Sequence, residues 1–183
     1  MMSKSENGWD VIKDQSDKKL TVVRLAKSDI PLRLHKDAAK LLAYVAVRFD
    51  KEVSPLRLNN KPGFQDDGGY SFRKIENSIK FSNHASGTAI DLNWQRFPMF
   101  RRNMTKKQVE ACRAIVADCE GLVRWGGEYT RAVDQMHFEI APKITAEQIK
   151  KFVSRKRVKA DGSVPIGGST LPQHIRDLNG GKG

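Results

Sequence analysis

Two short segments constrain the fold of this chain more than any other feature. Residues 82–91 read Ser-Asn-His-Ala-Ser-Gly-Thr-Ala-Ile-Asp, and residues 134–139 read Asp-Gln-Met-His-Phe-Glu. Around both segments polar and apolar residues alternate, which is the pattern of a strand with one face in the core. If the two strands are neighbours, Asp91, His137 and Glu139 face the same cleft.

The polar side chains of these segments form a complete set of ligands for a catalytic zinc ion. Such a site takes two histidines and one carboxylate and leaves a fourth position for water. The chain has four histidines, and His84 and His137 are the two that lie in these segments. We interpret the other two, His35 and His174, as structural residues.

Asp134 is a candidate general base, but its spacing imposes a condition. It lies three positions before His137, so a regular strand would place the two side chains on opposite faces. Asp134 can reach the same ion only if the chain turns just before the strand. The polar stretch 131–135, which follows Gly126-Gly127, is a suitable place for that turn.

The remaining pattern predicts an α+β fold with a mainly antiparallel sheet flanked by helices. Strands are expected at 53–58 (an edge strand, because it contains proline), 70–75, 88–93, 122–125 and 136–140, with turns at 61–63, 66–69 and 126–127. Apolar spacing predicts a helix over 36–50. Capping-box pairs Thr105/Gln108 and Thr145/Gln148 begin helices that run to Gly121 and to about Arg157.

The length suits one domain. We expect an N-terminal arm or edge segment over 1–30, a catalytic domain over 31–158 and a flexible basic tail over 159–183. Cys112 and Cys119 would lie about 10 Å apart along one helix, too far for a disulfide, and are expected to be buried thiols.

The charge and the polarity of the chain limit its partners and its location. The net charge is +12, and residues 143–183 carry nine basic against three acidic residues. Such a surface attracts polyanions, either nucleic acid or an anionic bacterial envelope, or it only keeps the protein soluble. No stretch approaches the roughly 20 apolar residues of a membrane span. The polar N-terminus has no apolar signal segment, which predicts synthesis in the cytoplasm without a signal peptide.

The combination Ser-x-His-x-x-Gly-x-Ala-x-Asp followed by Asp-x-Met-His-Phe-Glu resembles the M15-type zinc peptidases. This family includes D-alanyl-D-alanine carboxypeptidases and L-alanyl-D-glutamate endopeptidases. The resemblance covers about residues 36–142. Trp125-Gly126-Gly127 also resembles a segment of phage endolysin members, although Tyr129 stands where many of these have tryptophan.

The resemblance implies a role for each residue of the site. His84, Asp91 and His137 would bind one zinc ion, and Asp134 would be the catalytic base. An arginine upstream of the first histidine would hold a substrate carboxylate or the developing oxyanion. Arg73 is the best match, because Arg48 lies in a predicted helix and Arg57 precedes a turn. Three further residues are assigned to the cleft or to the support of the ligands: Ser82, Trp125 and Glu139.

The resemblance also implies a hedgehog/DD-peptidase-like fold and a function. We expect a zinc-dependent peptidoglycan peptidase of the phage endolysin type, a monomer that acts on the bacterial cell wall after release from the host cytoplasm. L-Ala–D-Glu is the first choice of bond and D-Ala–D-Ala the alternative. A hedgehog-like zinc-containing binding module is the non-enzymatic alternative. A nucleic-acid binder, which rests on charge alone, is not expected.

Overall fold

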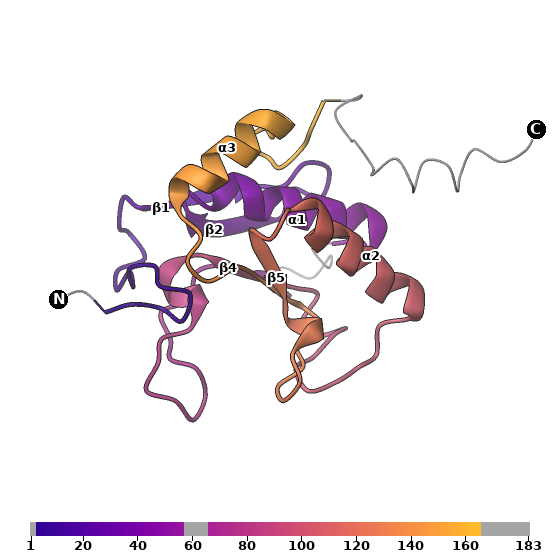
Figure 1. The fold of residues 1–183 in the computed structure, drawn as a ribbon, viewed down its shortest axis with the longest axis horizontal. Coiled ribbons are helices and arrows are strands. Elements are labelled where there is room, and N and C mark those ends of the chain that lie inside the picture. Colours follow the sequence, from indigo (N-terminus) through magenta and orange to yellow (C-terminus); the bar gives the residue numbers. More distant parts are fainter. Residues whose placement is uncertain (1–2, 57–65, 166–183) are drawn as a thin grey trace, which may run out of the picture.

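A four-stranded antiparallel sheet holds the two histidine segments side by side (Figure 1). The structure is a computed structural model, and it describes residues 3–56 and 66–165. The strand order is β3 (Asp67–Gly68), β4 (Ala89–Leu92), β6 (His137–Ile140) and β5 (Val123–Trp125). In the pairing of β4 with β6, Asp91 lies opposite His137. The two segments are therefore neighbouring strands, as their polar residues required.

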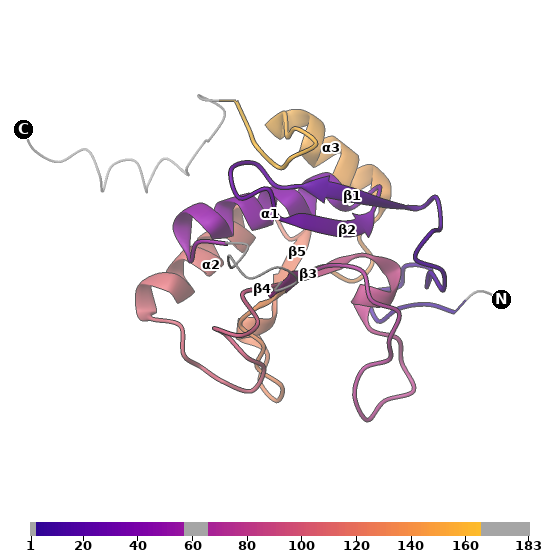
Figure 2. The same cartoon turned by 180° about the vertical axis from the view of Figure 1, so that it is seen from behind.

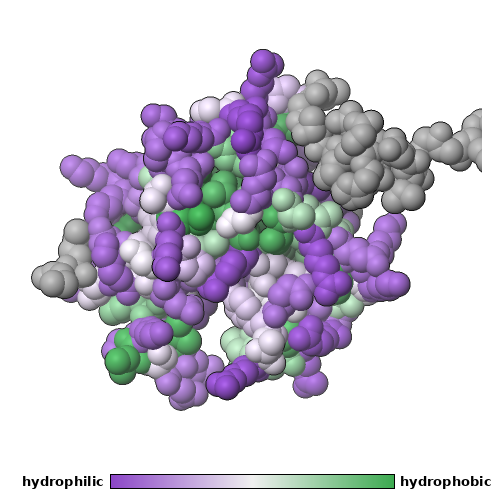
Figure 3. All heavy atoms as spheres, viewed as in Figure 1, coloured by the Kyte–Doolittle hydropathy of each residue, from purple (hydrophilic) through white to green (hydrophobic). Residues whose placement is uncertain are grey.

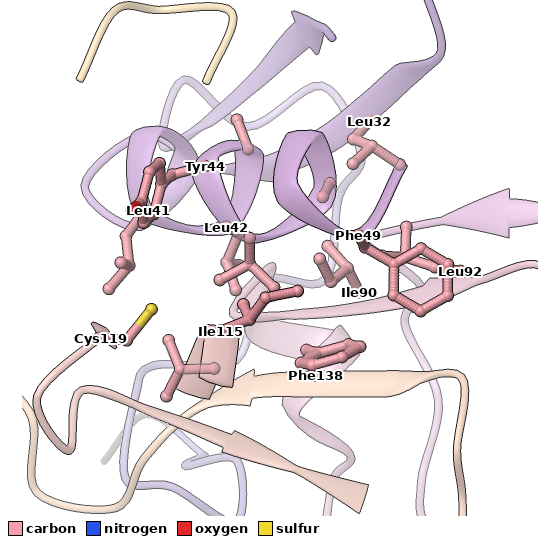
Figure 4. Packing of buried hydrophobic residues seen from close by; sticks show 14 of the residues in the cluster. Leu32, Leu41, Leu42, Tyr44, Phe49, Ile90, Leu92, Ile115, Cys119 and Phe138 are labelled. Carbon is pink, nitrogen blue, oxygen red and sulfur yellow. The ribbon is translucent and has the colours of Figure 1, made fainter. Parts of the chain in front are cut away.

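One face of this sheet belongs to the hydrophobic core. Ile90 and Phe138, which pair across β4 and β6, are fully buried. Helix α1 (Ala39–Glu52) packs on this face, and its Phe49 ring meets Phe138 edge-to-face at 5.9 Å (Figure 4). Truncating a buried phenylalanine to alanine costs about 3–5 kcal/mol, so the register is strongly fixed. The alternation then directs Asp91, His137 and Glu139 to the opposite face.

The helices form largely where the sequence predicted them. α1 begins three residues after the predicted start at 36 and ends two residues after the predicted end at 50. α2 (Lys106–Asp118) and α3 (Ala146–Lys156) both begin at complete capping boxes, so the two predicted caps are confirmed. The α+β class with an antiparallel sheet in one domain is confirmed as well.

The N-terminal part of the chain is integrated into the domain. β1 (Leu20–Arg24) and β2 (Pro31–His35) form an antiparallel pair that lies beside α1 (Figure 2). Ser5 and Asn7 are buried and bonded to the β4 region. The segment predicted as an arm over 1–30 thus packs on the sheet over its described residues. It packs partly through polar groups, which leave no hydrophobic periodicity in the sequence.

Several predicted turns and strands are wrong. Residues 53–56 form no strand, and 67–68, inside a predicted turn, form β3. The predicted strand over 70–75 is an irregular segment with a single bridge from Lys74 to Phe81. Its backbone donors bond to separate elements, for example to β2 through Arg33, so no continuous ladder forms. Residues 57–65 and 166–183, with Arg57, the 61–63 turn, His174 and most of the tail, lie outside the described residues.

Hydrophilic side chains cover most of the face seen in Figure 3, in keeping with the high net charge. No helix in the described ranges is long and apolar enough to cross a membrane. Cys112 and Cys119 are free and buried, as predicted. Burial raises the pKa of both thiols to about 12, which keeps them protonated and unsuited to metal binding.

Asp118, at the end of α2, joins the three helices. Its carboxylate accepts a hydrogen bond from Tyr44 of α1 at 2.5 Å and one from Lys156 of α3 at 2.7 Å, and it pairs with Arg48 at 3.2 Å. Burial alone would raise the pKa of Asp118, but the bonds from Lys156 and Tyr44 and the nearby positive charges outweigh it and lower the pKa. The ionised carboxylate therefore stabilises the folded state.

We predict that Asp118→Asn lowers the free energy of unfolding by about 1–3 kcal/mol at pH 7, because bonds to a charged group are lost. An unfolded aspartate has a pKa of about 3.9, and the folded value is lower. The contribution is thus present above pH 4 and is lost as the pH falls through the folded pKa. Urea unfolding at pH 7 and pH 3 measures both effects. Glu110→Gln, at an exposed helical pair with Lys106, is the control and should change little. An equal loss at both pH values would contradict the account.

Candidate metal centre

Three potential metal ligands meet on the polar face of the sheet. His84 lies in the 3-10 helix η1 (Asn83–Ser86), Asp91 in β4 and His137 at the start of β6. One ligand atom from each lies within 4.8 Å of the others. His84 Nε2 is 3.1 Å from Asp91 Oδ2 and 3.3 Å from His137 Nδ1, and His137 Nδ1 is 2.8 Å from Asp91 Oδ1.

A tight turn presents His84 to the other two ligands. Ser82 caps η1, since its hydroxyl accepts a hydrogen bond from the backbone N–H of His84 at 3.3 Å. Gly87 ends η1 with a φ of 68°, a conformation that favours glycine. A Cβ atom at Gly87 would also lie 2.6 Å from the backbone nitrogen of His35. The motif residues Ser82 and Gly87 therefore fix the loop.

The outer nitrogen of each histidine determines which inner nitrogen can bind a metal. His84 Nδ1 lies 2.6 Å from the carbonyl oxygen of Gly69, and a carbonyl only accepts. We therefore assign the proton of His84 to Nδ1, which leaves the Nε2 lone pair free. His137 Nε2 lies 3.0 Å from Glu139 Oε2 and by the same reasoning carries a proton, so Nδ1 is the nitrogen of His137 that can offer a lone pair to a metal ion.

The resulting arrangement fits a metal ion. His84 Nε2, His137 Nδ1 and the Asp91 carboxylate point at each other, and these groups need a proton or a metal ion between them. Ligand atoms bound to one tetrahedral zinc at about 2.0–2.1 Å lie about 3.3 Å apart. The two ring nitrogens are 3.3 Å apart, and each lies near a different oxygen of Asp91, His137 Nδ1 at 2.8 Å from Oδ1 and His84 Nε2 at 3.1 Å from Oδ2. Each histidine also has the second hydrogen-bond partner that ligating histidines usually have.

The electrostatics of the cluster also favour a bound cation. Burial alone would raise the pKa of Asp91, but the histidines beside it outweigh burial and hold the pKa well below its usual range. Burial would lower the pKa of His137, but Asp91 and Glu139 raise it to about 10. The ring of His137 thus favours a second proton, which a metal ion can replace.

Asp134 lies beside this cluster, and the turn that its role requires is present. The backbone N–H of His137 donates to the Asp134 carbonyl at 3.2 Å, which closes a turn just before β6. The carboxyl group is buried, and its Oδ1 has no hydrogen-bond partner among the described residues. Burial raises the pKa of Asp134 to about 6. A carboxyl group that has an oxygen without a hydrogen-bond partner and a pKa near neutral is suited to accept a proton.

The Trp-Gly-Gly segment holds the loop that carries Asp134. Trp125 is buried, and its indole N–H donates to the carbonyl of Gln135 at 2.8 Å. The carbonyl of Gly126 accepts from the Asp134 backbone N–H at 2.9 Å. A Cβ atom at Gly126 would lie 2.5 Å from the Asp134 carbonyl oxygen and 3.2 Å from the His137 Cβ. This close approach explains the need for glycine.

Of the two candidate arginines that the structure describes, Arg73 lies beside Asp91. Its Nη2 lies 3.7 Å from Asp91 Oδ2, and its side chain is half-exposed. The carbonyl of Arg73 accepts from the Ser82 backbone N–H at 3.1 Å, which ties it to the His84 loop. Arg48 is engaged with Glu52 and Asp118 instead.

Glu139 has partners that the sequence did not reveal. Its Oε1 accepts hydrogen bonds from Arg124 and, at 2.9 Å, from the Tyr129 hydroxyl. Its Oε2 accepts from Asn83 Nδ2 at 2.5 Å as well as from His137. Arg124 could have been found by strand alternation, because it lies between the buried Val123 and Trp125. Asn83 and Gly69 gave no such signal.

Glu128 and His35 have partners outside the cluster. Glu128, a conceivable alternative base, is exposed and forms an ion pair with Arg113 at 2.7 Å. His35 packs edge-to-face on Trp9 at a ring separation of 4.9 Å, which fits its structural interpretation.

Comparison with known proteins supports the interpretation of the two segments. Residues 76–140 match the protein-family model described as D-alanyl-D-alanine carboxypeptidase. This segment is similar to the M15-type peptidases. The match spans His84, Asp91, Asp134 and His137, and it excludes the N-terminal segment and Arg73. No match was found among curated proteins or solved structures.

Proposed function

We propose that this M15-type protein is a zinc-dependent peptidase that hydrolyses stem peptides of bacterial peptidoglycan. The observation that carries the proposal is the convergence of three potential ligand atoms on one point. Beside them lies the buried carboxylate of Asp134, whose Oδ1 has no hydrogen-bond partner among the described residues. The family match over the same residues supports peptide hydrolysis as the chemistry of the site.

His84 Nε2, Asp91 and His137 Nδ1 would hold the zinc ion. When bound, zinc lowers the pKa of a water ligand toward about 7 and polarises the carbonyl of the substrate. The carbonyl of Gly69 and the carboxylate of Glu139 keep the two imidazole rings in the required tautomers. These contacts reduce the reorganisation that binding would otherwise require.

Asp134 would move the proton during hydrolysis. Its unpartnered Oδ1 can accept a proton from the attacking water and return it to the leaving amine. Glu139 is a poor candidate for this role, because both of its oxygens already accept two hydrogen bonds or more. Its pKa is about 2, since bonds and charge from His137 outweigh the effect of burial.

Arg73 would bind the negative charge of the substrate. Its guanidinium lies at the edge of the cluster and is half-exposed, so it can reach a substrate carboxylate or the oxyanion that forms at the scissile carbonyl. Its pairing with Asp91 keeps it directed at the site.

The bond within the stem peptide has two candidates. We propose L-Ala–D-Glu, with a role in wall lysis of the phage endolysin type, on the basis of the Trp125-Gly126-Gly127 resemblance. The description of the matching family model favours a D-Ala–D-Ala carboxypeptidase as the second candidate. A hedgehog-like binding module would keep the zinc ligands but would not use the open carboxylate of Asp134.

We predict that Asp134→Asn lowers peptidoglycan hydrolysis by at least about 100-fold, since general acid–base catalysis typically contributes 10²–10⁴-fold. Zinc content should stay at one ion per chain, because Asp134 supplies none of the three ligand atoms. His137→Ala should lose both zinc and activity. Turbidity loss of purified cell walls and elemental analysis measure the two properties.

Glu128→Gln is the matched control, because it removes an exposed carboxylate nearby in sequence. Full activity of a folded Asp134→Asn variant, together with loss of activity in Glu128→Gln, would move the base to Glu128 and contradict the assignment.

Mass spectrometry of digested peptidoglycan should identify the bond. Cleavage at L-Ala–D-Glu releases peptides that begin with D-Glu and leaves L-Ala on the glycan. A D-Ala–D-Ala carboxypeptidase releases only free D-alanine. Zinc-loaded protein that binds walls and releases neither product would contradict peptidase function and favour a binding module.

A further inference from the structure

The segment Ser5–Trp9 lies outside the family match, yet a chain of hydrogen bonds joins it to the metal centre. We infer that this segment positions the ligand His137 through Asn83 and Glu139. The inference rests on the metal site of the proposed function. It assigns a positioning role to residues that the two motifs do not include.

The first step is the anchoring of Asn7 in the fold. Asn7 is buried, and its side-chain amide donates to the Thr88 hydroxyl at 2.9 Å and to the Ile140 carbonyl at 3.0 Å. Its side-chain oxygen accepts from the Ser5 hydroxyl at 2.8 Å. The two amide bonds connect the segment to Thr88, just before β4, and to Ile140, the last residue of β6, so the backbone of Asn7 is held against the sheet that carries Asp91 and His137.

The second step is the orientation of the Asn83 amide. The backbone N–H of Asn7 donates to Asn83 Oδ1 at 2.8 Å. Because only the oxygen of the amide can accept this bond, the NH₂ group must point the other way. It points to Glu139, where Nδ2 lies 2.5 Å from Oε2. A flipped amide would place two acceptors against each other at this point.

The third step is the fixing of Glu139 and, through it, of the His137 ring. Glu139 is 2% exposed and receives donors from η1, β5, the residue after η2 and β6. The same oxygen that accepts from Asn83 accepts the proton of His137 Nε2. The position of that oxygen therefore sets the rotation of the ring and the direction of the Nδ1 lone pair.

Loss of such a supporting contact typically lowers metal affinity by 10–100-fold. The decisive variant is Asn83→Leu, which is similar in size and uncharged and removes both side-chain bonds. We expect zinc affinity, measured by competition with a chromophoric chelator, to fall by about tenfold or more. NMR of the His137 ring should also show loss of the exchange-protected Nε2 proton, which a merely structural role of Asn83 would not remove.

Ser86→Ala is the matched control. Ser86 lies on the same turn and bonds to the same segment through Ser5 at 2.9 Å, but it has no bond to Glu139. We expect its zinc affinity to stay within about threefold of the wild type. Asn7→Ala and Tyr129→Phe should each weaken zinc binding by a smaller factor than Asn83→Leu, and they decide the question if Asn83→Leu does not fold.

The inference is overturned if the zinc affinity of Asn83→Leu is within threefold of that of Ser86→Ala. If Asn83→Leu does not fold, the inference is overturned when Asn7→Ala and Tyr129→Phe both bind zinc with wild-type affinity. Wild-type protein that binds no zinc would instead refute the metal site of the proposed function. The two failures are therefore distinguishable.

Discussion

The pairing of β4 with β6 is the interaction on which the site depends. It places Asp91 opposite His137 while Ile90 and Phe138 meet on the other face, beneath α1. A slip of one residue would bury the polar set and expose the apolar one. The cost of exposing these large side chains thus also protects the geometry of the ligands. The same register fixes the core packing and brings the candidate metal ligands Asp91 and His137 together.

The polar face of the sheet is organised around three side chains whose ligand atoms face one another, His84, Asp91 and His137. Gly69 and Glu139 accept the outer protons of the two histidines, so the inner nitrogens can hold a metal ion together with Asp91. Glu139 is fully bonded, whereas Asp134 keeps an open oxygen. This difference in hydrogen bonding separates a supporting carboxylate from one that can accept a proton, although both are buried.

The sequence predicted the elements whose patterns are local. Capping boxes at Thr105 and Thr145, and alternation around Asp91 and His137, were sufficient for two helices and two strands. Sequence-based prediction failed for segments whose structure depends on polar contacts with residues far away in the sequence. The 70–75 segment bonds to separate elements and forms no strand, and the N-terminal segment is anchored by Asn7. Asn83 and Gly69 act through individual hydrogen bonds that leave no periodic pattern in the sequence, so only the three-dimensional structure reveals them.

The central claim is that two specific ring nitrogens and one carboxylate face a common metal ion. Anomalous diffraction at the zinc edge from zinc-loaded crystals tests this claim most directly. The account predicts one peak bonded to His84 Nε2, Asp91 and His137 Nδ1, with His137 Nε2 still on Glu139. A peak elsewhere, or zinc bound through His137 Nε2 or the Glu139 carboxylate, would contradict it.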